Sequence, residues 1–139
     1  MKITIALSKA EITAVIMARS ALKHLLDPRR PPVLTPDRRP ALDLLIESAI
    51  SGLALKMSAE VDKDEDGDLI YLRGDISSGN KMSALRRVME TAIADKVLAE
   101  AYKGVDSEFS EACSENCFIS ELGLRAVAAG DARILATYY

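Results

Sequence analysis

Aromatic side chains are scarce in this chain of 139 residues, which contains no Trp, two Phe and four Tyr. Because aromatic rings supply much of the buried area in many proteins, the core here must rely on Leu, Ile, Val and Met, with helices that approach closely across alanine. Apolar residues make up 49% of the chain and charged residues 28%, which is the balance of an ordinary soluble globular protein. We therefore expect a single globular domain over residues 1–139.

Cysteine and histidine are nearly absent, since the chain has only Cys113, Cys117 and His24. The two cysteines are four residues apart in a segment that we expect to be helical, where a disulfide across one turn is geometrically poor. Zinc usually takes four protein ligands, and the histidine lies far away in sequence. These features predict two buried thiols, and they favour a cytoplasmic location. We expect His24 near the end of a helix, where its charged form would face the carbonyl end of the helix dipole.

Long apolar runs and concentrated positive charge are both missing. No segment reaches the ~18 uninterrupted apolar residues of a membrane-spanning helix, and Lys9, Glu11 and Arg19 interrupt the N-terminal apolar segment before it could serve as a signal peptide. The net charge of −3 gives no reason to expect nucleic acid binding, which requires a concentrated basic surface. We also find no nucleophile elbow, phosphate-binding loop, zinc protease or dinucleotide motif. The sequence thus favours a non-catalytic protein that binds neither membranes nor nucleic acid.

What is present is periodicity, which predicts a mostly helical α+β fold with three to four helices. Residues 2–7 alternate polar and apolar side chains, as a short N-terminal strand would. Ser8 and Glu11 have the spacing of a capping box at the start of the first helix, and Asp27 before Pro28 should end it. The apolar positions expected to face the core from this helix are Ile12, Val15, Ile16, Leu22, Leu25 and Leu26.

Three further helices follow from the same signals. The second should begin near Pro40, a residue suited to the first helical turn, and end at Gly52. The third should run from about residue 80 to residue 103 and has apolar positions on more than one face, which suggests self-association. The fourth should begin after Asp106 or Ser107, and Gly123 should separate it from one more short helix.

A change of period after Gly52 predicts a β-hairpin around residues 54–76. Apolar residues alternate with polar ones before an acidic stretch and resume the alternation after it. Asp66 followed by Gly67 is a strong turn dipeptide between two such segments. The apolar positions before the turn are Leu53, Leu55, Met57, Ala59 and Val61.

The acidic stretch, DKDEDGDLIYLR at residues 62–73, resembles the calcium-binding loop of EF-hand proteins. Oxygen ligands are expected at positions 1, 3, 5 and 7 of such a loop and glycine at position 6, and Asp62, Asp64, Asp66 and Asp68 with the intervening glycine fit. Position 12, normally a bidentate Glu, is Arg73. These four aspartates are therefore our candidate metal ligands for calcium, and the alternative is a hairpin turn whose charges are relieved by that arginine and by solvent.

All five prolines of the chain fall in residues 28–40, together with four of its arginines. With Asp27 included, this segment reads DPRRPPVLTPDRRP. Proline fixes its backbone angle and lacks an amide proton, so we expect an extended surface connector, partly polyproline-like. It could also bind a partner or an anion.

These features lead to one functional prediction and two alternatives. The prediction is a non-catalytic interaction or assembly subunit that acts through helical and hairpin surfaces, with a protein partner or with itself as a homo-oligomer. The first alternative is a calcium-stabilised module using residues 62–68. The second is an enzyme or small-molecule binder with an acidic site that no motif reveals.

Overall fold

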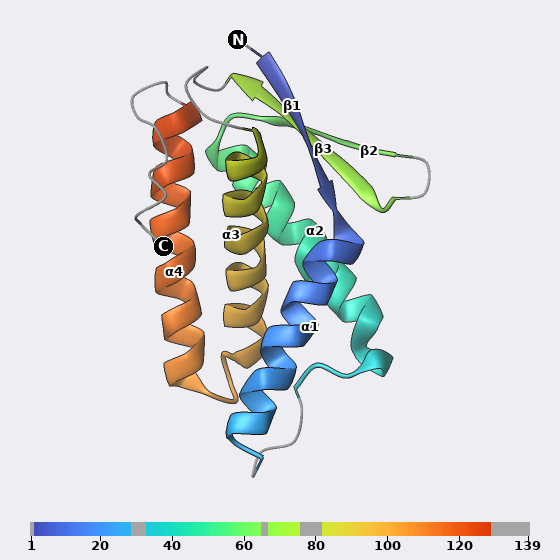
Figure 1. Ribbon diagram of the computed structural model, residues 1–139, viewed down its shortest axis with the longest axis vertical. Coiled ribbons are helices and arrows are strands. Elements are labelled where there is room, and N and C mark those ends of the chain that lie inside the picture. The colour runs from blue at the N-terminus through green and yellow to red at the C-terminus, as the bar shows by residue number, and fades with distance from the viewer. Residues whose placement is uncertain (1, 29–32, 65–66, 76–81, 129–139) are drawn as a thin grey trace.

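The computed structural model describes residues 2–28, 33–64, 67–75 and 82–128. A small sheet is combined with long helices that make up most of the molecule, so the predicted α+β architecture is confirmed (Figure 1). In chain order the elements are β1 (Lys2–Ser8), α1 (Lys9–Leu26), the 3₁₀ helix η1 (Pro36–Arg38), α2 (Arg39–Lys56), β2 (Glu60–Lys63), β3 (Leu69–Asp75), α3 (Met82–Tyr102) and α4 (Ser107–Ala128).

The three strands form one antiparallel sheet in the order β1-β3-β2, so β1 and β2 are its edges. Ile5 lies opposite Leu72 and Leu7 opposite Ile70 in the register. All four of these side chains are buried, whereas Thr4 on the opposite face is exposed. The sheet therefore covers the helices with one face and turns the other to solvent, as antiparallel sheets commonly do.

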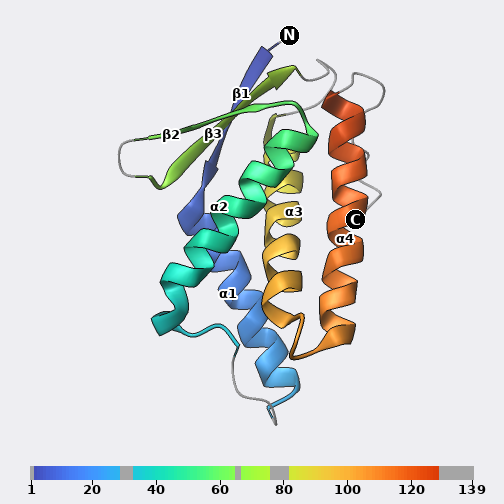
Figure 2. The same cartoon turned by 180° about the vertical axis from the view of Figure 1, so that it is seen from behind.

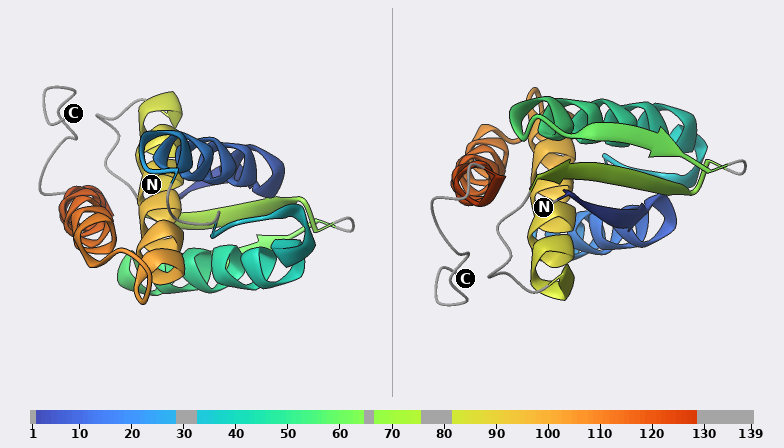
Figure 3. Two further views of the ribbon diagram at one scale, coloured as in Figure 1. Left: turned by 90° about the horizontal axis from the view of Figure 1, so that it is seen from below. Right: turned by 90° about the horizontal axis from the view of Figure 1, so that it is seen from above.

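Helix α3 lies between α4 on one side and α1 and α2 on the other, with the sheet at one end of the helices (Figures 1 and 2). The view along the helices in Figure 3 shows the same arrangement. Ile93, Ala94, Val97, Leu98 and Ala99 are all buried, although they point in different directions around the helix. The broad apolar surface of α3 is therefore used inside the molecule, and it gives no support to the self-association that its sequence suggested.

Two predicted helix ends are wrong. Helix α2 continues through Gly52 to Lys56, so the alternating residues 53–56 are helical and the hairpin begins at Glu60. The helix ends where Ser58 adopts a positive φ of 54°: the Ala59 amide donates to the Ala54 carbonyl (2.8 Å) and the Ser58 amide to the Leu55 carbonyl (3.2 Å). This is the hydrogen-bond pattern of a Schellman motif.

The second wrong end is at Gly123, because α4 runs unbroken from Ser107 to Ala128. A single glycine costs a helix only ~1 kcal/mol, which tertiary packing readily offsets. The residues after Gly123 that were predicted to form a separate short helix are therefore part of α4 as far as Ala128. Residues 129–139 lie outside the described residues.

The predicted starts of α1, α2 and α4 and the end of α1 are confirmed, whereas the start signals predicted for α3 lie outside the described residues. The Ser8 hydroxyl accepts a hydrogen bond from the Glu11 amide (3.3 Å), and Asp27 follows the last residue of α1. The Asp106 carboxylate accepts from the Phe109 amide (3.2 Å) at the start of α4. Pro40 lies in the first turn of α2. None of the helices in the described residues has an apolar stretch of the length and character that a membrane crossing requires.

The Pro/Arg-rich connector is less extended than predicted. Residues 29–32, which hold its first two arginines and the two adjacent prolines, lie outside the described residues. Beyond them, Val33 and Leu34 pack against the core, and Arg38 donates to the Val33 carbonyl (2.7 Å). The connector therefore folds back into a 3₁₀ turn that leads directly into α2.

Candidate functional site

The acidic stretch forms the turn of the β2–β3 hairpin, as the turn interpretation predicted. The two strands pair antiparallel, Gly67 has a φ of +75°, and the Asp64 amide donates to the Leu69 carbonyl (3.1 Å) to close the turn. A strand, not a helix, follows the turn. The paired-helix surroundings of an EF-hand are therefore absent on this side.

Two carboxylates of this turn, those of Asp62 and Asp68, have separate partners, whereas Asp64 Oδ1 is buried without a hydrogen-bond partner among the described residues. Asp68 accepts from the Ala10 amide (3.1 Å) and from the Ser8 hydroxyl (3.4 Å) at the start of α1, while Asp62 accepts from the adjacent Lys63 amide (3.0 Å). In the part of the chain that the structure describes, no three His, Cys, Asp or Glu side chains gather as a metal site would need. Asp66 lies outside that part, so calcium binding by Asp62, Asp64, Asp66 and Asp68 stays a prediction.

Arg73, predicted to relieve the charge of the turn, lies on β3 opposite Glu60 of β2. Its Nε donates to the Thr4 hydroxyl of β1 (3.4 Å). The guanidinium therefore spans the exposed face of the sheet, with an acid on one neighbouring strand and a hydroxyl on the other.

The two cysteines are both buried and both free, as predicted. They face the interior of the bundle from α4, where burial raises the pKa of each thiol; that of Cys117 rises to about 12, with Glu121 adding to the effect. Since the thiolate is the reactive form, burial disfavours nucleophilic chemistry at both residues. His24 lies in the last turn of α1, where it was expected.

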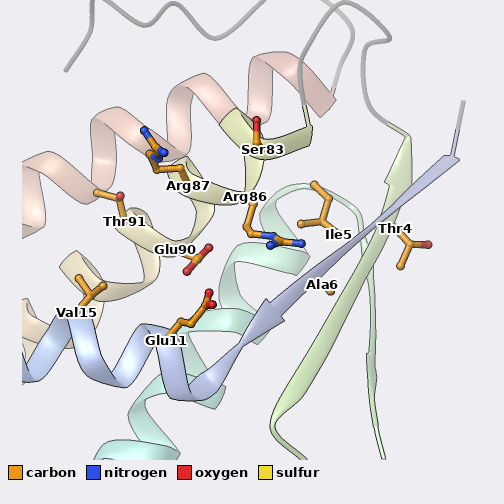
Figure 4. A pocket seen from close by; sticks show the side chains of 10 residues that line it. All are labelled: Thr4, Ile5, Ala6, Glu11, Val15, Ser83, Arg86, Arg87, Glu90 and Thr91. Atoms are coloured by element: carbon orange, nitrogen blue, oxygen red, sulfur yellow. The ribbon is translucent and has the colours of Figure 1, made fainter.

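A cavity that sequence reasoning missed lies between β1, α1 and α3 (Figure 4). Its volume is about 500 Å³, which is within the range of small-molecule pockets. β1 contributes its free edge at residues 4–6, α1 contributes Glu11, and α3 contributes Arg86, Arg87 and Glu90. In Figure 4 the carboxylates of Glu11 and Glu90 approach each other, and the Arg86 side chain extends toward β1.

The charges of this cavity are not neutralised by close pairing. Among the described residues, no ion pair within 4.0 Å and no side-chain hydrogen bond joins Glu11, Arg86, Arg87 and Glu90. The pKa of Glu90 is raised, first by burial and then by the negative charge of Glu11, while the two arginines oppose the shift. A single sequence does not reveal this cluster, because only the packing of α1 on α3 brings residue 11 beside residue 90.

A second unexpected feature is the outward face of α1. Only Ile12 and Ile16 of its predicted core stripe are fully buried, whereas Leu22, Leu25 and Leu26 are 57%, 75% and 77% exposed. The prediction that the later leucines face the core is therefore wrong. Between Glu11 and Leu26 the other exposed positions of the helix are Ala14, Val15, Ala18 and Ala21. Val15 also lines the cavity, so we call the other three of these positions, with Ala10 and the three leucines, the outer face of α1.

Comparisons of the chain with protein-family models, with curated proteins and with solved structures gave no match. Two features of the structure therefore bear on function. One is the charged cavity, and the other is the outer face of α1.

Proposed function

We propose that the protein is a non-catalytic assembly subunit that self-associates through the outer face of α1. The observation that carries this proposal is the exposure of Leu22, Leu25 and Leu26 together on one helix. A single exposed leucine is ordinary, but a contiguous apolar surface on a folded protein usually marks an interaction site.

The distribution of side-chain size on α1 favours a second copy in antiparallel orientation. Small residues, Ala10 and Ala14, occupy the first half of the outer face, and the leucines occupy the last two turns. When two copies of α1 pack antiparallel about a two-fold axis near Ala18, Ala10 lies opposite Leu26 and Ala14 opposite Leu22 of the second copy, while Leu25 lies opposite Glu11. An isologous interface requires this self-complementarity, and alanine near the axis lets the helices approach closely.

Charge supports the same orientation. Antiparallel packing of two copies of α1 (Lys9–Leu26) opposes the two helix dipoles, which favours association. A parallel arrangement would bring like ends together.

The size of the surface indicates a weak dimer. Eighteen residues of helix span ~27 Å, and a strip of that length and ~10 Å width is well below the ~800 Å² per partner of standard interfaces. We therefore expect a dissociation constant of about tens to hundreds of micromolar.

Sedimentation equilibrium from about 20 μM to about 1 mM, the range that brackets this constant, tests the proposal. The wild-type mass should rise toward that of a dimer, whereas Leu22→Lys/Leu25→Lys should stay monomeric. Leu44→Lys/Leu55→Lys is the matched control, because these leucines of α2 are 68% and 81% exposed but lie off the outer face of α1. A monomeric wild type, or equal loss in both variants, would refute the proposal.

Cross-linking gives the geometry independently. Because Cys113 and Cys117 are buried, an Ala18→Cys variant has one accessible thiol, near the expected two-fold axis. We expect it to form a disulfide-linked dimer under mild oxidation. Ser48→Cys, at an exposed position of α2, should cross-link much more slowly; equal rates would rule out the antiparallel α1 pair.

A further inference from the structure

The cavity between β1, α1 and α3 carries an inference that is independent of self-association. We propose that it binds a small zwitterion with a primary amine and a carboxylate, the amine lying between Glu11 and Glu90 and the carboxylate at Arg86. The ligand class is therefore that of amino acids and related ω-amino acids.

The argument starts from the two carboxylates. They come from different helices and face each other across the cavity (Figure 4), and the negative charge of Glu11 disfavours the charged form of Glu90. An ammonium group relieves this repulsion and can donate three hydrogen bonds. The raised pKa of Glu90 is the electrostatic consequence of burial and of the unrelieved charge of Glu11.

A metal ion fits these residues less well than an amine does. Hard cations take six or more oxygen ligands, and the cavity offers two carboxylates and no third among the described residues. Arg86 and Arg87 on the same wall would repel a divalent ion. Arg86, which extends toward β1 while Arg87 points away from the two carboxylates (Figure 4), suits instead a ligand that ends in a carboxylate, because a guanidinium binds that group with two parallel hydrogen bonds.

The surroundings of the charged groups fit a small polar molecule. Ser83 and Thr91 of α3 line the cavity beside the arginines, and their hydroxyl groups can donate or accept hydrogen bonds. The edge strand β1 lines the opposite wall at residues 4–6. The ligand would thus lie in an open cavity between three elements that the core holds in place.

Calorimetric titration with a length series of zwitterions tests the inference. The probes are glycine, 4-aminobutyrate and 6-aminohexanoate, which bracket the separation of the two charges, and the matched single-charge probes are butylamine and butyrate. At least one zwitterion should bind, and should bind at least ~10-fold more tightly than either single-charge probe, since each lost charged hydrogen bond costs about this much. Heat from butylamine or butyrate equal to that from the best zwitterion, or heat from none of the probes, would overturn the assignment.

Variants locate the binding site. Glu90→Gln and Arg86→Gln should each weaken the best probe ~10-fold or more. Lys96→Gln/Glu100→Gln is the control, because this exposed pair lies on the same helix but outside the cavity. In the wild-type protein, amide chemical-shift changes on adding the probe should cluster at residues 4–6, 11–15 and 83–91. Changes elsewhere would contradict the proposed site, and this measurement needs no variant to fold.

The pH dependence gives a further check. Binding of the amine requires the charged form of Glu90, so affinity should fall as the pH drops through the raised pKa of that carboxyl. The groups that face it are Glu11 on α1 and Arg86 and Arg87 on α3, and β1 brings no titratable side chain at residues 4–6. Affinity that rises on acidification would contradict the placement of the amine. The monomeric Leu22→Lys/Leu25→Lys protein should still bind the probe, which separates this inference from the proposed dimer.

Discussion

Ser58 occupies a position at a helix end where glycine is the usual residue. Its φ of 54° lies in the left-handed region, where an ordinary L-residue is less stable by ~1–2 kcal/mol because Cβ crowds the following carbonyl. The Schellman hydrogen bonds of Ala59 and Ser58 hold it there. The chain therefore accepts local strain at the junction between α2 and the hairpin.

Replacing Ser58 with glycine should remove this strain. We expect Ser58→Gly to raise the free energy of unfolding by ~0.5–1 kcal/mol, the strain relieved less the greater backbone entropy that glycine loses on folding. Urea denaturation followed by circular dichroism measures the change. Ser51→Gly, the same substitution at an exposed interior position of α2, should lower stability by ~0.5–1 kcal/mol. If both variants shift in the same direction, the backbone explanation is wrong.

At the scale of elements, the hairpin turn is attached to the start of α1 through Asp68. Its carboxylate accepts from the Ala10 amide and the Ser8 hydroxyl, and its backbone carbonyl accepts from the Lys9 amide (2.9 Å). A residue 58 positions away in sequence from Ala10 thus supplies a cap to a helix whose first amides would otherwise lack partners. One of the aspartates that suggested calcium binding therefore has a structural role.

Removing this cap should destabilise the fold. We expect Asp68→Ala to lower the free energy of unfolding by ~1–2 kcal/mol, the upper half of the range for lost N-caps, because a negative charge at a helix N-terminus is lost with it. Asp62→Ala is the matched control and should change stability by less than ~0.5 kcal/mol, since among the described residues that exposed side chain accepts only from its neighbour's amide. Thermal unfolding at low salt gives both values, and equal losses would show that Asp68 does not cap α1.

Elements whose signals are local could be predicted from the sequence. The start of α1 at Ser8 and its end at Asp27 depend on residues within one turn, and the hairpin turn depends on Gly67. The end of α2 could not be predicted, because serine in a left-handed conformation carries no sequence signal. The packing around position 52 does not require glycine, since a Cβ at Gly52 would meet no heavy atom within 4 Å.

The candidate sites depend on tertiary packing and were beyond sequence reasoning. Leu22, Leu25 and Leu26 continue the helical period of Ile12 and Ile16, and their exposure follows only from where α1 leaves its neighbours. The cavity likewise requires α1 and α3 to lie side by side. Within its own helix, each charged residue of the cavity has the spacing typical of a solvent-exposed helix face, so no sequence signal indicates that these residues meet.

At the scale of the whole molecule, an ion pair between a half-buried arginine and a buried aspartate links three helices. Arg19 of α1 lies 2.7 Å from the carboxylate of Asp95 on α3 and also donates to the Cys113 sulfur of α4 (3.7 Å). Asp95 is only 2% exposed. Its pKa is raised, because burial outweighs the hydrogen bond and the charge of Arg19.

Removing the arginine should destabilise the fold, because it leaves the buried carboxylate of Asp95 without its ion-pair partner. We expect Arg19→Met to lower the free energy of unfolding by ~3 kcal/mol at neutral pH, as uncompensated buried charges do. Arg39→Met, which breaks an exposed ion pair with Asp43, should change it by less than ~0.5 kcal/mol. The double variant Arg19→Met/Asp95→Leu should recover most of the loss, because it leaves no charge unpaired.

The loss should also depend on pH in a defined direction. A carboxyl whose pKa is raised on folding binds its proton more tightly in the folded state, so it favours the fold below its unfolded pKa and loses that contribution as the pH rises through the folded value. Without Arg19 the pKa of Asp95 should rise further. The difference between wild type and Arg19→Met should therefore be smaller at about pH 4.5 than at about pH 7.5, measured by urea denaturation at both. A difference independent of pH would mean that the arginine contributes through packing of its side chain and not through the charge of Asp95.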